Sequence, residues 1–247
     1  MHKKLLYIIP ICIGVIIFIY LNRTYAHVYS LFDKTSNPNM ALNYTIGNTH
    51  ATHTIRYAAL GDSLTAGVGA TDAKHALPYL LSEKIAQKNT QIKLFNLGQP
   101  GATSADVLKQ QIVPLTSFAP DLITLCIGTN DMHQRVSMAD FKKNYNQILD
   151  DLQRYQKAQI ILINLPYLGT DKLVQSPWPT YYDSQIKKYN QVIADIATER
   201  KLTLVDLYDK TKVYFKNNQS QVYSADLYHP NDAGYAYWTD IIYASYH

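Results

Sequence analysis

From about residue 54 onward, short apolar runs alternate with longer amphipathic segments. The apolar runs are β-branched or leucine-rich and close at Gly, Pro or Asp, which is typical of strands buried on both faces. They predict five strands, at residues 55–60, 92–97, 122–127, 160–165 and 202–207. The amphipathic segments predict helices at residues 77–88, 104–111, 138–156 and 182–201, and a last helix that starts near residue 231.

Strands that alternate with helices of this length predict a parallel sheet covered on both faces, a three-layer α/β/α sandwich. The clearest helical period lies in segment 138–156, where apolar residues recur at spacings of three and four. In such sheets, ligands bind beyond the carboxyl ends of the strands. Polar, glycine-containing turns follow three of the predicted strands, at residues 61–63, 98–101 and 128–131. These turns are therefore the expected location of a functional site.

The first 26 residues differ from the rest of the chain. Lys3 and Lys4 precede a nearly unbroken apolar run over residues 5–21, and a small-residue cleavage site can follow Ala26. A basic head before such a run is typical of an export signal. The run also approaches the roughly 20 residues that span a bilayer and is longer than a typical signal core, which favours an uncleaved membrane anchor over a cleaved signal. We expect an extracytoplasmic protein, membrane-anchored or secreted.

Composition narrows the classes of function further. With 247 residues, 47% of them hydrophobic, the chain suits one substantial domain. We assign this domain to residues 54–247, the leader to residues 1–26 and a polar linker to residues 27–53. The formal net charge of +4 comes partly from the leader. Because no dense basic run occurs elsewhere, we expect no nucleic-acid partner. The sequence leaves the oligomeric state open.

Ser63 is the first candidate for chemistry, because Gly61-Asp62-Ser63-Leu64 directly follows the first predicted strand. A serine hydroxyl becomes a useful nucleophile only beside a general base. A serine between a strand and a helix is also a common helix N-cap, so the tetrapeptide alone leaves both readings open. Thr65 stands where the nucleophile elbow of α/β-hydrolases has its second glycine, which disfavours that fold.

The candidates for the base and its carboxylate are His229 and Asp226, in the segment Asp226-Leu227-Tyr228-His229-Pro230. Pro230 favours an extended backbone at His229, and Asp226 can reach the far ring nitrogen through a local turn. Such an arrangement fixes the histidine tautomer and stabilises the imidazolium. Asp232 is a rival carboxylate, better explained as an acid in the first turn of a helix. Taken alone, this segment also fits an ordinary surface turn.

Two further residues could stabilise an oxyanion. Asn130 follows a predicted strand in Gly128-Thr129-Asn130-Asp131, and its amide NH2 could donate to a forming negative charge. Gly101 could present a backbone N–H without a side chain in the way. Pro-Gly and Asn-Asp are also common turn sequences, so each is weak evidence by itself.

Together these four segments resemble the blocks of the GDSL or SGNH hydrolase family, in family order from about residue 55 to the C-terminus. The resemblance is closest to lysophospholipase-like and arylesterase-like members. It implies a flavodoxin-like α/β/α fold with Ser63 as nucleophile, His229 as base and Asp226 as its orienting carboxylate. It also implies an oxyanion hole formed by Ser63 N–H, Gly101 N–H and Asn130.

The function expected from this resemblance is a serine esterase that cleaves small-molecule or lipid carboxylic esters through an acyl-enzyme on Ser63. No metal or organic cofactor is expected, because the triad and the oxyanion hole carry the chemistry. Two alternatives stay open. One is an O-acetyl esterase or acyltransferase that acts on cell-surface glycans, and the other is an inactive surface-binding module.

Several other residues could line a site. His133 comes just after Asn130 and could also face solvent. The segment 167–182 is long for a connection and contains apolar residues, which is typical of binding loops or lids, and it could equally pack over the sheet edge without contacting substrate. The chain has 21 tyrosines, and four of them lie near His229: Tyr223, Tyr228, Tyr235 and Tyr237. These could line an acyl or sugar pocket, although packing in the core is their default role.

Overall fold

The computed structural model describes residues 43–86, 89–168, 173 and 178–246, and in the N-terminal part residues 10, 12–20, 22–24, 26 and 30. Its centre is a six-stranded sheet in the order β1-β3-β2-β4-β5-β6. All neighbouring strands run parallel except β1, which pairs antiparallel with β3 at one edge. The sheet is therefore mostly parallel, as predicted.

The strands are short and apolar at their centres. Every residue of β4 is buried, and so are the last five of β2, which explains why these strands appear in the sequence as continuous apolar runs. Their bounds are β1 (Asn43–Gly47), β2 (His53–Gly61), β3 (Thr90–Asn96), β4 (Leu122–Cys126), β5 (Gln159–Ile163) and β6 (Thr203–Val205).

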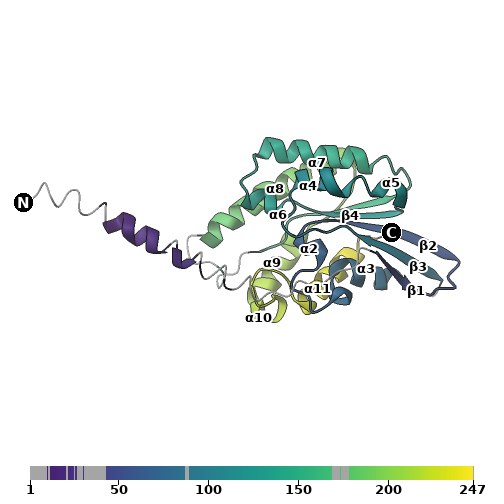
Figure 1. Cartoon of the computed structure of the whole chain (residues 1–247), viewed down its shortest axis with the longest axis horizontal. Coiled ribbons are helices and arrows are strands. Elements are labelled where there is room, and N and C mark those ends of the chain that lie inside the picture. The colour runs from purple at the N-terminus through teal and green to yellow at the C-terminus, as the bar shows by residue number, and fades with distance from the viewer. Residues whose placement is uncertain are drawn as a thin grey trace, which may run out of the picture.

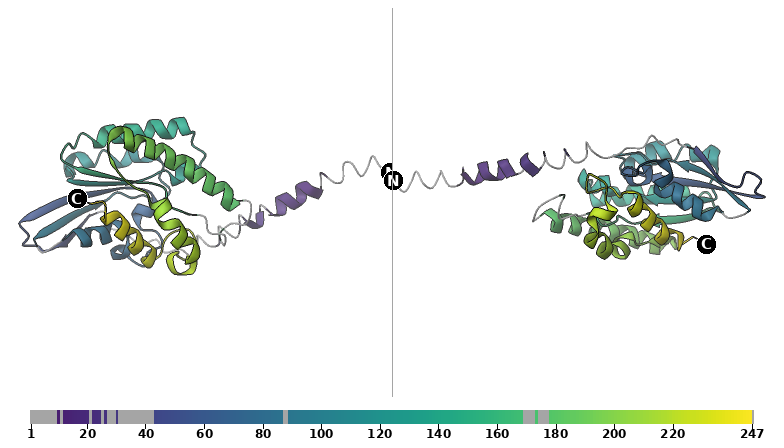
Figure 2. Two further views of the ribbon diagram at one scale, coloured as in Figure 1. Left: turned by 180° about the vertical axis from the view of Figure 1, so that it is seen from behind. Right: turned by 90° about the horizontal axis from the view of Figure 1, so that it is seen from below.

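Helices cover both faces of the sheet, and Figures 1 and 2 show the three layers. On one face lie α7 (Met138–Leu152) and α8 (Trp178–Arg200), with the short α4 (Ser104–Asp106), α5 (Leu115–Phe118) and α6 (Thr129–His133) nearby. On the other face lie α3 (Leu77–Ile85), α9 (Leu207–Asn217), α10 (Gln219–Val222) and α11 (Asp232–Tyr243). The predicted α/β/α sandwich is confirmed.

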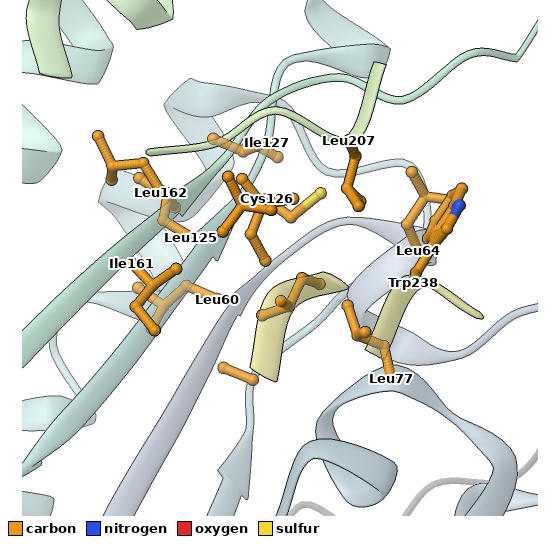
Figure 3. Close-up of a cluster of buried hydrophobic side chains, with 14 of the residues drawn as sticks. Leu60, Leu64, Leu77, Leu125, Cys126, Ile127, Ile161, Leu162, Leu207 and Trp238 are labelled. Carbon is orange, nitrogen blue, oxygen red and sulfur yellow. The ribbon is translucent and has the colours of Figure 1, made fainter. Parts of the chain in front are cut away.

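The core lies between these layers. Strand side chains such as Leu60, Leu125 and Ile161 meet helix side chains such as Leu64 and Trp238 in the cluster drawn in Figure 3. Trp238 and Leu60 are fully buried. Burying a large apolar side chain contributes roughly 1.5–3 kcal/mol, so this cluster fixes α2 (Ser63–Ala66) and α11 against the sheet.

The predicted linker over residues 27–53 ends too late, and the structure corrects it. Asn43–Gly47 forms β1, in register with β3 from Asn43 opposite Phe95 to Gly47 opposite Gln91. His53 already belongs to β2. Only Ile46 of β1 is buried, so this edge strand carries no apolar run that the sequence could reveal. Residues 27–29 and 31–42 of the predicted linker lie outside the described residues.

The leader predicted over residues 1–26 also lies partly outside the described residues. Within the part of the chain that is described, no helix combines the length and the apolar character that a membrane crossing requires. The predicted binding loop over residues 167–182 is described only at residues 167, 168, 173 and 178–182. Its last five residues form the start of α8, four residues earlier than predicted.

Candidate active site

The strand order places the candidate site where the topology reverses. From β2 the chain crosses to β3 on one side and then returns past β2 to β4 on the other. In open α/β sheets, the crevice at such a switch point, beyond the carboxyl ends of the strands, is where ligands bind. Ser63 follows β2 and Asn130 follows β4, so both candidates lie at this crevice.

The turn that carries Ser63 is tightly built. Asp62 is the N-cap of α2, and its Oδ1 accepts a hydrogen bond from Leu64 N–H at 3.0 Å. Ser63 is therefore the first helical residue, and its alternative reading as an N-cap is wrong. A Cβ at Gly61 would lie 2.2 Å from Thr65 Oγ1 and 2.3 Å from the Cys126 carbonyl oxygen, so only glycine fits there.

A buried side-chain amide holds this turn, and sequence reasoning missed it. Gln111 Oε1 accepts a hydrogen bond from Gly61 N–H at 2.9 Å, and Gln111 Nε2 donates to Gly61 C=O at 2.8 Å. Gln111 ends η2 (Val107–Gln111), a π-helical turn that continues α4. Segments of π-helix are rare and frequently occur at functional sites. No sequence signal linked Gln111 to a residue 50 positions earlier.

The structure brings the three predicted triad residues together in series. His229 Nε2 lies 2.9 Å from Ser63 Oγ, and His229 Nδ1 lies 2.5 Å from Asp226 Oδ2. Asp226 is fully buried and His229 is 5% exposed, whereas Ser63 is half-buried. A hydroxyl, an imidazole and a carboxylate in this order form the arrangement that activates a serine.

The turn that carries Asp226 and His229 is held by its own hydrogen bonds. Asp226 Oδ1 accepts from Ser224 Oγ at 2.7 Å and from the N–H groups of Tyr228 and His229, each at 2.9 Å. Leu227 has a φ of 58°, a left-handed conformation that is uncommon for a branched side chain. This backbone lets the carboxylate fold back onto its own turn.

The rival carboxylate, Asp232, has a different role. It lies in the first turn of α11 and accepts hydrogen bonds from Thr71 N–H at 2.8 Å and from Thr71 Oγ1 at 2.7 Å. It therefore tethers the loop after α2 to α11, and Asp226 is the carboxylate that contacts His229.

The three predicted oxyanion donors follow different strands. Gly101 has a φ of 83° in the turn closed by Ala102 N–H and Gln99 C=O at 3.0 Å. Asn130 Nδ2 donates one hydrogen bond, to Ala102 C=O at 3.0 Å, which ties its amide to this same turn. Among the described residues, neither Ser63 N–H nor Gly101 N–H has a hydrogen-bond partner. Their role in an oxyanion hole stays a prediction.

A buried aspartate connects the Gly101 turn with the Asn130 turn. Asp131 accepts from Ser104 N–H at 2.8 Å and from Ser104 Oγ at 2.5 Å. Asn144 donates to the same Ser104 hydroxyl at 3.1 Å. Because Ser104 begins α4 directly after the Gly101 turn, this contact fixes the two turns relative to each other.

The electrostatics of the nucleophile turn centre on Asp62. Burial raises the pKa of this carboxyl to about 7, and the nearby Asp131 adds to the shift, although the Leu64 N–H bond opposes it. In the described part of the chain, Asp62 Oδ2 is buried without a hydrogen-bond partner. Burial also raises the pKa of Asp131. The nucleophile therefore stands beside a carboxyl that takes up a proton near neutral pH.

Of the four tyrosines near His229, one touches it. The Tyr228 ring packs edge-on against the His229 ring, with 4.9 Å between ring centroids. Tyr228 OH lies 2.8 Å from His133 Nε2, and His133 is itself exposed, so its role in lining the site stays a prediction. The other three have different contacts: Tyr223 OH donates to Tyr167 C=O, Tyr235 OH donates to Val68 C=O, and Tyr237 stacks on Tyr214.

Comparisons with known proteins agree with this geometry. The model of the GDSL-like lipase/acylhydrolase family matches residues 59–237. The spore germination lipase LipC of Bacillus licheniformis is 23% identical over 202 residues, which cover 74% of this chain and 92% of that protein. Esterase TesA of Pseudomonas aeruginosa is 24% identical over 149 residues, which cover 60% of this chain and 68% of that protein.

Solved structures show the same fold. A lipase/acylhydrolase from Enterococcus faecalis has a TM-score of 0.63 at 24% identity, covering 77% of this chain and 94% of its own. An acetyl xylan esterase, AlAXEase, has a TM-score of 0.63 at 22% identity, covering 78% of this chain and all of its own. The family match spans most of the folded domain. The chain therefore belongs to the GDSL-like lipase/acylhydrolase family and is a carboxylic ester hydrolase.

Proposed function

We propose that this protein is an extracytoplasmic serine esterase that works through an acyl-enzyme on Ser63. The observation that carries the proposal is the unbroken series from Ser63 Oγ through the His229 ring to Asp226, with contacts of 2.9 and 2.5 Å. A serine with such a base can attack an ester carbonyl at neutral pH.

In the first half-reaction, Ser63 Oγ attacks the carbonyl carbon while His229 Nε2 takes the hydroxyl proton. Asp226, bound to Nδ1, stabilises the imidazolium that results. The tetrahedral intermediate collapses when the bond to the alcohol oxygen breaks, and His229 gives its proton to that oxygen. In the second half-reaction, water attacks the acyl-enzyme in the same way, which releases the carboxylic acid and restores Ser63.

The negative charge on the former carbonyl oxygen needs donors that are already in place. Ser63 N–H and Gly101 N–H are unpaired within the described residues, and Asn130 Nδ2 has used one of its two hydrogens. All three lie at the carboxyl ends of the sheet, in turns tied together by the Ser104–Asp131 contact. These features support their assignment as the oxyanion hole.

The proposed location rests on the leader. Lys3 and Lys4 precede the apolar run over residues 5–21, which suits either an export signal or an anchor that holds the enzyme at a membrane. Fractionation of cells that express the full chain tests this, with the chain lacking residues 1–26 as the matched control. The full chain is expected outside the cytoplasm. Equal retention of both forms in the cytoplasm would contradict the proposal.

Replacement of the nucleophile tests the chemistry. We expect Ser63→Ala to abolish hydrolysis of p-nitrophenyl acetate, because it removes the hydroxyl that contacts His229 Nε2. Ser137→Ala is the matched control, since Ser137 is an exposed N-cap of α7 away from the triad. Full turnover by Ser63→Ala would overturn the assignment.

A further inference from the structure

A continuous series of aromatic rings leads from the triad base to the protein surface. Each ring contacts the next, with centroids 4.9 to 6.1 Å apart. We call this series the aromatic strip, and its members, from the inside outward, are Tyr228, His133, Tyr182, Tyr181 and Trp178. Its inner end is the ring that packs against His229.

The innermost ring of the strip, Tyr228, is held firmly, and the His133 side chain next to it is exposed. Tyr228 is 8% exposed, its N–H donates to Asp226, and its hydroxyl is hydrogen-bonded to His133 Nε2 at 2.8 Å. His133 lies one helical turn after Asn130 in α6. The strip therefore begins between the triad turn and the helix that carries a proposed oxyanion donor.

The outer half of the strip faces solvent. Tyr181 is 44% exposed, and both Trp178 and Tyr182 are half-buried in the first turns of α8. Exposure of apolar aromatic surface to water is unfavourable in free energy, and a ligand that covers these rings removes that surface from water. Their side chains combine apolar ring surfaces with polar tips, namely two hydroxyls and an indole N–H.

The position of the strip indicates which half of the ester it contacts. His229 Nε2 must reach the oxygen of the leaving alcohol to give it a proton. The substituent on that oxygen therefore lies close to the His229 ring and to Tyr228, where the strip begins. This position favours contact of the strip with the alcohol half of the substrate over contact with the acyl group on Ser63.

The chemistry of the strip indicates the kind of alcohol. A sugar ring has a flat C–H face that packs on an aromatic ring and hydroxyls around its rim that bond to polar tips. A long alkyl alcohol would leave those tips unpaired. An anionic lipid headgroup would require cations, and within the described residues the charge of Arg135 acts on Tyr182 of the strip. The described contacts along the strip are between aromatic rings, which favours the sugar.

We propose that the aromatic strip binds the alcohol half of the ester and that this half is an O-acylated sugar ring. The inference rests on the proposed serine esterase function. It assigns the substrate to the glycan class, so that acyl groups are removed from, or transferred to, sugar hydroxyls. In the hydrolytic direction, the bond between the acyl carbon and the sugar oxygen breaks and His229 protonates that oxygen.

The test compares two acetyl esters with the full chain. One is an O-acetylated methyl xyloside, which has a sugar ring, and the other is glycerol monoacetate, which has free hydroxyls and no ring. We expect Tyr182→Ala to lower the ratio of kcat/KM for the xyloside to kcat/KM for glycerol monoacetate about tenfold, mainly through KM. Tyr181→Ala, at a more exposed position, is the second variant if Tyr182→Ala does not fold.

Tyr214→Ala is the matched control. Tyr214 is 39% exposed and stacks on Tyr237 in α9 and α11, away from the strip. We expect it to leave the ratio unchanged. An unchanged ratio in both strip variants would overturn the inference, and so would equal losses on the two esters. A loss seen chiefly with lysophosphatidylglycerol would assign the strip to a lipid headgroup instead.

The two proposals fail in different ways. If the wild-type chain cleaves glycerol monoacetate through Ser63 but shows no dependence on the strip, only the sugar inference fails. The same holds if it cleaves glycerol monoacetate and not the xyloside. If it cleaves neither ester and an activity-based serine probe leaves Ser63 unlabelled, the proposed function fails as well.

Discussion

The two sides of the active site differ in how completely their hydrogen bonds are made. On the proton-transfer side, Asp226 accepts three hydrogen bonds at Oδ1 and one at Oδ2, from the His229 ring, among the contacts between described residues. On the oxyanion side, Ser63 N–H and Gly101 N–H have no partner within the described residues. The base needs one fixed orientation at all times, whereas the donors must be open for a charge that exists only during the reaction.

The largest loss of activity is expected from a substitution on the proton-transfer side of the active site. Asp226→Asn replaces a charged acceptor by an amide that favours the wrong histidine tautomer, which costs about 10⁴-fold in kcat in a comparable triad. Turnover of p-nitrophenyl acetate measures it. Asp232→Asn is the matched control, because Asp232 bonds to Thr71 and should leave kcat unchanged. Similar losses in both variants would show that Asp226 acts through folding alone.

Removal of a hydrogen-bond donor from the oxyanion side should lower kcat by a smaller factor. Asn130→Ala takes away one oxyanion donor, for which we expect a loss of about 10²- to 10³-fold in kcat with KM little changed. Asn146→Ala serves as the control, because Asn146 in α7 accepts its hydrogen bonds from Arg200 at the end of α8. If Asn130→Ala raised KM and left kcat intact, the amide would be a ground-state contact and not an oxyanion donor.

The support beneath the nucleophile can be tested with a pair of similar contacts. Asn190 holds both backbone groups of Leu165 after β5 at 2.8 Å, as Gln111 holds those of Gly61 after β2. Gln111→Met and Asn190→Leu should each lower the free energy of unfolding by about 1–3 kcal/mol, because backbone groups lose their partners.

Only Gln111→Met should also lower kcat, by about ten- to a hundredfold, because it shifts Ser63 relative to His229. Urea unfolding and ester hydrolysis measured on both variants give the comparison. Equal kcat values for the two variants would mean that the Gln111 contact has a purely structural role.

The smallest effect concerns the pH dependence of stability. The pKa of Asp62 is raised from 3.8 in the unfolded chain to about 7, so the folded state binds this proton more tightly. Its contribution to stability is complete below pH 4 and is lost as the pH rises from about 4 to about 7. Asp62→Asn keeps the acceptor for Leu64 N–H and removes the titration.

We therefore expect the free energy of unfolding of Asp62→Asn to fall less between pH 5 and pH 8 than that of the wild type. Urea unfolding at the two pH values measures the difference. An identical slope in both proteins would mean that Asp62 is ionised throughout this range.

Much of the fold could be predicted because its signal is local. Strand β4 and the last five residues of β2 are buried on both faces and therefore appear as apolar runs, and α7 shows its stripe at residues such as Phe141 and Tyr145. Strand β1 could not be recognised in the same way. It pairs with β3 at the edge of the sheet, where most of its side chains are exposed. The predicted helix over residues 104–111 is in fact α4 followed by the π-helical turn η2.

The triad residues could be predicted because their types and order carry the chemistry. Their support could not, because it depends on contacts between distant residues. Gln111 reaches Gly61 across 50 positions, and His133 reaches Tyr228 across 95. The left-handed backbone of Leu227 could not be predicted, because glycine, and not leucine, is the residue that usually occupies such a conformation.

The acyl-enzyme on Ser63 is the centre of this account, and covalent trapping tests it most directly. The full chain is treated with a fluorophosphonate, digested and analysed by mass spectrometry. We expect one modified peptide, which contains Ser63, and much slower labelling in His229→Ala because the serine loses its base. A wild-type chain that stays unmodified, or that carries the label on another residue, would contradict it.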